Sequence, residues 1–116
     1  NELNQEIATA ILEEAGFLVE VAKDGQTAVD MVKNSEPDYY RVVLMDVQMP
    51  VMGGYEATRT IRGLEDKKQA SIPIVAMTAN AFDEDRREAL QCGMDGHITK
   101  PIDMKNLFDT LDEILA

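Results

Sequence analysis

Residues 41–46 read RVVLMD, an apolar run with a charged residue at each end. A short run of this kind is typical of a strand buried on both faces of a sheet. Residues 73–78, PIVAMT, repeat the pattern, and residues 97–99, HIT, form a shorter run. Helical patterns separate these runs, and strands that alternate with helices predict a parallel sheet covered by helices on both faces.

Five segments carry apolar residues at helical spacing and end at residues that stop helices. We expect helices at residues 3–15, 28–32, 55–64, 83–92 and 104–115, with Gly16 and Gly93 ending two of them and Asp103 capping the last. Residues 17–22, FLVEVA, alternate as a strand does, and Asp24-Gly25 predicts a turn after it. Residues 65–71 are expected to form a charged surface connection.

The composition predicts one acidic globular domain spanning residues 1–116. The chain has 116 residues, 11 basic and 22 acidic, for a formal charge of −11. This charge repels nucleic-acid phosphate, so we expect no direct nucleic-acid binding. The longest apolar run, 42–45, is far shorter than the ~20 residues of a membrane span, so no membrane contact is expected. The lone Cys92 suits a reducing cytoplasm, and its neighbours offer it no base or metal-ligand partner.

Three chemically different side chains follow the predicted strands. Asp46, Thr78 and Lys100 come at or just after three strand ends, which meet at one edge of a parallel sheet. Any one of them could simply end a strand, cap a turn or carry a solvated charge. Together they suit phosphoryl chemistry, because an aspartate can hold a phosphoryl group while a lysine and a divalent cation neutralise its oxygens.

Three longer motifs resemble the receiver domain of two-component response regulators. They are LMDVQMPVMGGYEATRTIR at 44–62, IPIVAMTANAF at 72–82 and GMDGHITKPID at 93–103. The motifs are long and correctly spaced, and the resemblance covers the whole chain. It implies an α/β, flavodoxin-like, doubly wound parallel sheet. It also implies Mg²⁺-dependent phosphoryl transfer from a histidine to an aspartate, with a conformational change on the face that leads to the last helices.

The resemblance assigns chemical roles to four residues. Asp46 matches the phosphoacceptor and a Mg²⁺ ligand, and Gln48 matches the residue whose backbone carbonyl binds Mg²⁺. Lys100 matches the lysine that contacts the phosphoryl oxygens, and Ala79 matches the small residue beside the phosphate. These assignments predict a catalytic and phosphate-binding site at the carboxyl edge of the sheet.

The resemblance also predicts a switch. Thr78 matches the hydroxyl that bonds the phosphoryl group and moves toward it. His97 stands where receivers more often carry an aromatic residue that turns inward when the threonine moves. We therefore assign His97 to the switch and give it no catalytic role.

The match breaks at the start of the sequence. Receivers begin with a strand that ends in two acidic, Mg²⁺-binding residues, and Asn1 stands where that pair has just finished. In the strand order 2-1-3-4-5 the missing first strand would lie between residues 17–22 and 41–46. The sequence could omit residues of a longer protein, borrow a strand from another chain, or fold with altered packing and no Mg²⁺. We favour the first explanation.

Three functions compete at this stage. The leading one is a phosphorelay module that takes a phosphoryl group from a histidine kinase or a histidine phosphotransfer domain, most like the C-terminal receiver of hybrid sensor histidine kinases. Such a module catalyses its own phosphoryl transfer and hydrolysis but is not a free-standing turnover enzyme. The alternative is a phosphorylation-independent docking module of the same fold. An aspartate-dependent phosphatase would need an acid at position 48, where Gln48 cannot serve. Homodimerisation is left open.

Overall fold

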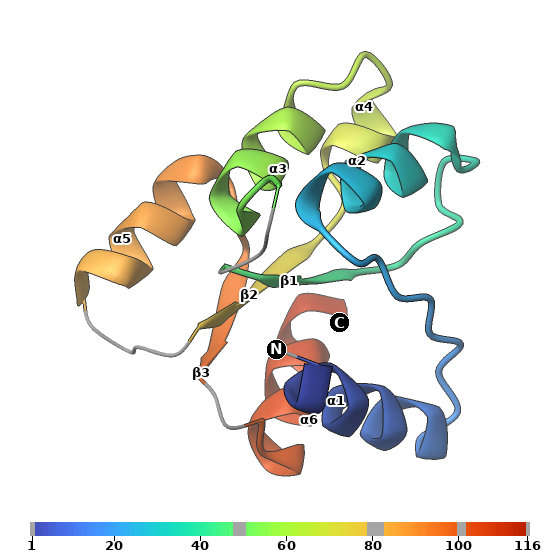
Figure 1. Ribbon diagram of the computed structural model, residues 1–116, viewed down its shortest axis with the longest axis vertical. Coiled ribbons are helices and arrows are strands. Elements are labelled where there is room, and N and C mark those ends of the chain that lie inside the picture. The colour runs from blue at the N-terminus through green and yellow to red at the C-terminus, as the bar shows by residue number, and fades with distance from the viewer. Residues whose placement is uncertain (1, 48–50, 79–82, 100–101, 116) are drawn as a thin grey trace.

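A computed structural model describes residues 2–47, 51–78, 83–99 and 102–115, with side chains from residue 6 in the first helix and residue 87 in the fifth. Its elements alternate between helices and short strands (Figure 1). They are α1 (Glu2–Glu14), α2 (Gly25–Asn34), β1 (Val43–Asp46), α3 (Gly54–Arg62), α4 (Lys67–Ala70), β2 (Ile74–Thr78), α5 (Asp83–Cys92), β3 (Gly96–Thr99) and α6 (Met104–Leu115).

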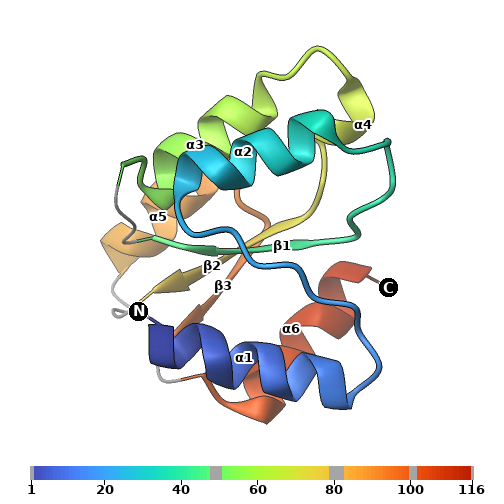
Figure 2. The ribbon, with the colours of Figure 1, turned by 45° about the vertical axis from the view of Figure 1, so that its right-hand side comes forward.

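The three strands form one parallel sheet in the order β1-β2-β3. Val43 pairs with Ile74, and Val75 pairs with Gly96, so the strands end close to one another at one edge. Helices α2, α3 and α5 lie on one side of the sheet, and α1 and α6 lie on the other (Figures 1 and 2). The predicted α/β architecture, with helices on both faces, is confirmed.

Each face of the sheet has its own hydrophobic core. Ile74 and Ala76 of β2 pack with residues of α2, α3 and α5, whereas Val75 and Met77 pack with residues of α1 and α6. Successive side chains of a strand point to opposite faces, so a strand between two helical layers must be apolar at every position. All five residues of β2 are buried accordingly, which explains the continuous apolar run.

The helix ends follow the local sequence. Gly16 and Gly93 adopt positive φ of 95° and 106° just past α1 and α5, as predicted. Asp103 Oδ1 accepts a hydrogen bond of 2.7 Å from Lys105 N, so the predicted cap of α6 is confirmed. The turn predicted at Asp24 is instead the cap of α2, since its carboxylate accepts from Thr27 N at 2.8 Å. None of the helices in the described ranges is long and apolar enough to cross a membrane.

Residues 17–22 do not form the predicted strand. A strand exists only where a neighbour completes its hydrogen bonds, and the described residues supply no such neighbour beside this segment. The segment is held by side chains instead: the hydroxyls of Tyr39 and Tyr40 both donate to the Glu20 carboxylate at 2.8 Å. Val19 joins the α1–α6 core, while Leu18 is fully exposed.

The connection expected at residues 65–71 contains a short helix, α4. Asp66 caps it by accepting from Lys68 N at 2.8 Å and from Gln69 N at 3.1 Å. None of its four residues is buried. The prediction of a charged surface segment was correct about its exposure and wrong about its conformation. A capping residue can start a helical turn in a segment that has no apolar pattern.

Candidate functional site

Asp46 and Thr78 lie at the carboxyl ends of neighbouring strands, as the strand pattern predicted. Asp46 pairs with Met77, so Thr78 is one residue further along the adjacent strand, and adjacent strands of a sheet lie about 4.8 Å apart. Only 4% of Asp46 and 8% of Thr78 is exposed. A carboxylate and a hydroxyl are thus both buried at the edge of the sheet where ligands of parallel α/β sheets bind.

The sheet register places the two predicted switch residues on one face. Thr78 pairs with Thr99, and Ala76 pairs with His97. Ala76 packs into the core beneath α3 and α5, so alternation along the strands directs Thr78 and His97 toward the same helical layer. Met45 packs in the core on the α3 side of the sheet. Asp46 is the next residue of the strand, so its side chain points to the opposite face. His97 is half-buried.

Three of the predicted site residues are outside the described ranges: Gln48, Ala79 and Lys100. Their roles in Mg²⁺ binding and phosphate binding remain predictions.

The backbone after Asp46 is in close contact with the start of α3, which sequence reasoning did not anticipate. Gly54 N donates to Val47 O at 3.1 Å. A Cβ on Gly54 would overlap the carbonyl oxygen of Asp46 and lie 2.9 Å from Val47 Cα. A Cβ on Gly25, at the start of α2, would likewise overlap the backbone of Met52. The Gly53-Gly54 pair was the available signal, since glycine allows backbones to approach.

The carboxyl edge of the sheet offers Mg²⁺ one carboxylate among the described residues, that of Asp46. This ion takes oxygen ligands, usually one or two carboxylates together with waters and phosphate oxygens. Asp46 supplies one buried carboxylate and so fits the smaller of these sets. Within the described ranges, no group of three or more His, Cys, Asp or Glu residues could hold a metal ion.

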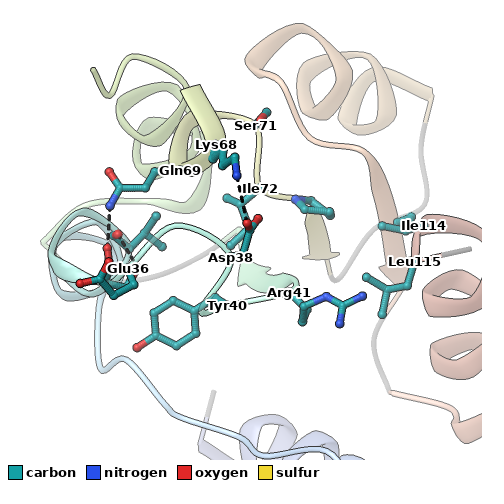
Figure 3. A pocket seen from close by; sticks show the side chains of 13 residues that line it. Glu36, Asp38, Tyr40, Arg41, Lys68, Gln69, Ser71, Ile72, Ile114 and Leu115 are labelled. Atoms are coloured by element: carbon teal, nitrogen blue, oxygen red, sulfur yellow. Dashed lines mark hydrogen bonds and ion pairs between the residues drawn. The ribbon is translucent and has the colours of Figure 1, made fainter. Parts of the chain in front are cut away.

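Two other features do not contribute to this edge. A cavity of about 300 Å³ lies at the opposite, amino-terminal end of the strands, where Lys68 pairs with Asp38 at 3.4 Å and Arg41 lines the opening (Figure 3). Cys92 is buried in the α3–α5 core and donates to Ala89 O at 3.2 Å. Burial raises the pKa of its thiol, in keeping with an unreactive cysteine.

Comparison with known proteins points to one family. The model of the response regulator receiver domain family matches residues 1–112. Hybrid signal transduction histidine kinase I of Dictyostelium discoideum is 39% identical over 97% of this chain. Sensor protein GacS of Pseudomonas syringae pv. syringae is 43% identical over 92% of it. The chain spans 7% and 12% of the lengths of these two proteins.

Solved structures agree with the sequence relatives. The receiver domain of the sensor histidine kinase PA1611 from Pseudomonas aeruginosa PAO1, crystallised with a magnesium ion coordinated in its active site cleft, superposes with a TM-score of 0.87. It is 36% identical, and the match covers 99% of this chain and 90% of that one. Vibrio cholerae chemotaxis protein CheY4 is 30% identical, with a TM-score of 0.84 over 98% of this chain and 90% of its own.

Proposed function

Because the chain belongs to the response regulator receiver domain family, we propose that Asp46 accepts a phosphoryl group from a phosphohistidine. A carboxylate oxygen of Asp46 attacks phosphorus while the bond between phosphorus and the imidazole nitrogen breaks. The imidazole leaves with that electron pair, and the phosphoryl group becomes an acyl phosphate. Water later attacks the phosphorus and restores the carboxylate.

One observation carries this proposal: a nearly buried carboxylate and a nearly buried hydroxyl end two neighbouring strands at the carboxyl edge of the sheet. Asp46 is 4% exposed and Thr78 is 8% exposed. A buried carboxylate is costly unless its surroundings compensate its charge, so its retention at a ligand-binding edge favours a chemical role. The Thr78 hydroxyl would hydrogen-bond a phosphoryl oxygen once the group is attached.

The remaining roles come from the family motifs. Lys100 would bring its ammonium to the phosphoryl oxygens, the small Ala79 would leave room for them, and Gln48 would offer its backbone carbonyl to Mg²⁺. When bound, Mg²⁺ neutralises charge on the transferring oxygens. Asp46 would hold the ion through its carboxylate, which also supplies the oxygen that attacks phosphorus.

The switch follows from the face that Thr78 and His97 share. Bonding of Thr78 to the phosphoryl group would draw its side chain toward the carboxyl edge. His97 faces the same helical layer and would move into the space that Thr78 leaves. The phosphoryl group thereby shifts the balance between two arrangements of the α5 side of the sheet.

The donor we propose is a histidine kinase or a histidine phosphotransfer domain. The support is the relatives: one of the two sequence matches described above is a hybrid signal transduction histidine kinase, the other is a sensor protein, and this chain resembles a small part of each. The remainder of such a protein would supply the signal and the phosphohistidine.

Intact-mass spectrometry tests the proposal. The purified chain is incubated with a small-molecule phosphodonor, with and without Mg²⁺, and we expect the mass of one phosphoryl group to be gained only with Mg²⁺. Asp46→Asn abolishes the gain. Asp24→Asn is the matched control, because Asp24 is also a buried aspartate and asparagine caps a helix equally well. Lys100→Ala slows the gain. Persistent labelling of Asp46→Asn would refute the assignment of the acceptor.

A phosphorylation-independent docking module is the second candidate. It would show no mass gain under any condition. It would still bind a histidine phosphotransfer domain, and its affinity would be the same with and without the phosphodonor and Mg²⁺. Binding measured by calorimetry on the same sample therefore separates the two functions.

A further inference from the structure

One guanidinium group joins the two segments that lead into neighbouring strands. Arg62, the last residue of α3, donates from Nε to Gly93 O at 2.8 Å. Its Nη1 donates to Ala70 O and to Ile72 O, each at 2.7 Å, and its Nη2 donates to Asp95 Oδ2 at 2.9 Å. Only 22% of this side chain is exposed. Arg62 therefore holds the segment before β2 and the segment before β3 against the end of α3.

Asp95 joins the beginnings of the two strands directly. Its Oδ2 also accepts from Ile74 N at 2.9 Å, and its own N donates to Ile74 O at 2.7 Å. Ile74 has no exposed surface, so its N–H needs an acceptor within the protein. Asp95 supplies that acceptor and also donates to the carbonyl of the same residue. This two-point bond can form in only one alignment of β3 against β2.

The side chains of β3 itself do little to fix that alignment. Side chains of a strand alternate between the two faces of a sheet, so a shift by two residues returns each side chain to the face that it had. In β3 only Ile98 is buried, in the core that α1 and α6 cover. A strand of four residues with one buried side chain specifies its register weakly. The bonds of Asp95 supply what the burial pattern lacks.

The alignment of β3 matters at the opposite edge of the sheet. The strand ends at Thr99, which pairs with Thr78. Thr78 is four residues beyond Ile74, roughly 13 Å along the strand at about 3.3 Å per residue. A slip of β3 by two residues would move its end by roughly 7 Å relative to Thr78. In the sequence, Lys100 follows Thr99 directly.

We infer that Asp95 and Arg62 are positioning residues of the phosphoryl site. From the amino-terminal edge of the sheet they hold β3 in register with β2, and this register sets where β3 ends beside Thr78. The register itself is a property of the fold. Its chemical consequence rests on the proposed function, in which the lysine after β3 contacts the phosphoryl oxygens. With β3 out of register, that ammonium would miss the phosphoryl group that Asp46 carries.

Amide hydrogen exchange of the unphosphorylated chain tests the register. Asp95→Ala should speed exchange of Ile74 and of residues 96–99 by about tenfold, the change expected for the loss of one charge-assisted hydrogen bond. Asp66→Ala is the matched control, because Asp66 likewise accepts from backbone amides, at the start of α4, and it should leave those amides unchanged. Equal effects of the two variants, or a uniform rise over the whole chain, would overturn the inference.

Two milder variants separate the acceptor oxygen from the fold, and they serve if Asp95→Ala does not fold. Asp95→Asn keeps an acceptor oxygen for Ile74 and Arg62, so we expect nearly wild-type exchange. Arg62→Lys keeps the charge and the aliphatic stem but lacks the planar fork that reaches several acceptors, so we expect faster exchange at residues 96–99. The inference fails if Arg62→Lys behaves as the wild type, and exchange in Asp95→Asn as fast as in Asp95→Ala would contradict the role of the acceptor oxygen.

The rate of phosphoryl gain tests the chemical consequence. Intact mass is followed over time with Mg²⁺ and a phosphodonor, and Asp95→Ala should slow the gain by about tenfold, since a misplacement of about 1 Å can cost about a hundredfold. Asp95→Asn should restore the wild-type rate. If the register acts through Lys100, combining Asp95→Ala with Lys100→Ala should slow the gain no further than Lys100→Ala alone. A merely structural effect would multiply the two losses, and that result would overturn the positioning role.

The two measurements fail separately. Absence of a phosphoryl gain in the wild type would refute the proposed function and, with it, the chemical consequence of the register. The exchange measurement needs no phosphorylation, so it still decides whether Asp95 and Arg62 hold β3 in place.

Discussion

Replacing Gly54 by alanine should disturb the acceptor aspartate directly. The new Cβ would overlap the Asp46 carbonyl oxygen and lie 2.9 Å from Val47 Cα, where ordinary contact begins at 3.4 Å. Both neighbours are backbone atoms, so the start of α3 and the end of β1 must separate by at least half an ångström. Overpacking of this kind costs about 1–3 kcal/mol. Stiffening of the unfolded chain offsets about 0.4–1 kcal/mol of that cost.

The net loss of about 1–2 kcal/mol should lower the melting temperature by roughly 4 °C per kcal/mol for a chain of this length. Displacement of Asp46 should also slow labelling by about tenfold, because a misplacement of about 1 Å can cost about a hundredfold. Gly63→Ala, at the other end of α3, is the control: its Cβ would lie 3.6 Å from the oxygens of Arg59 and Thr60, at a φ of −91°. Thermal unfolding and a mass-spectrometric time course measure both variants. If Gly54→Ala matched Gly63→Ala in both assays, the reasoning would be refuted.

Three further outcomes are expected. Thr78→Ala should still gain a phosphoryl group but lose the phosphorylation-dependent change in hydrogen exchange of α5, and an unchanged response would exclude the switch role. Desolvation and the hydrogen bond to Glu20 raise the pKa of Tyr40 to about 12, so the neutral phenol favours the folded state. The stability contributed by this group is complete below about pH 10 and is lost as the pH rises toward 12, so urea midpoints at about pH 9 and 11 should differ less in Tyr40→Phe than in the wild type. Ile61→Ala, at a side chain with no exposure, should cost about 2–5 kcal/mol in urea unfolding, whereas Leu90→Ala, at a residue 66% exposed, should cost less than about 0.5 kcal/mol.

Much of the fold was predictable from local pattern. The runs at 41–46 and 73–78 mark β1 and β2 to within two residues, because a strand between two helical layers is apolar on both faces. Helix α5 was predicted with the bounds that it has, since charged residues open it and Gly93 closes it. These features depend on the residues within each segment and on the burial of its apolar side chains away from water.

Long-range pairing set the limits of that prediction. Residues 17–22 have the alternation of a strand, yet no strand forms without a neighbour to complete its hydrogen bonds. The site divides in the same way. Asp46 and Thr78 could be placed because strand ends converge in any parallel sheet, whereas the contact of Gly54 with the Asp46 backbone required the angle at which α3 returns to the sheet.

The order of the elements that form, their burial and the chemistry at the strand ends could be predicted from the sequence alone, because burial and capping depend on a few neighbouring residues. The contacts of Arg62 were not, since Ala70 is eight residues away and Asp95 is thirty-three. A guanidinium has five N–H donors. No rule based on sequence says which carbonyl groups will accept from them. Which segments Arg62 joins was decided only when α3, β2 and β3 met in space.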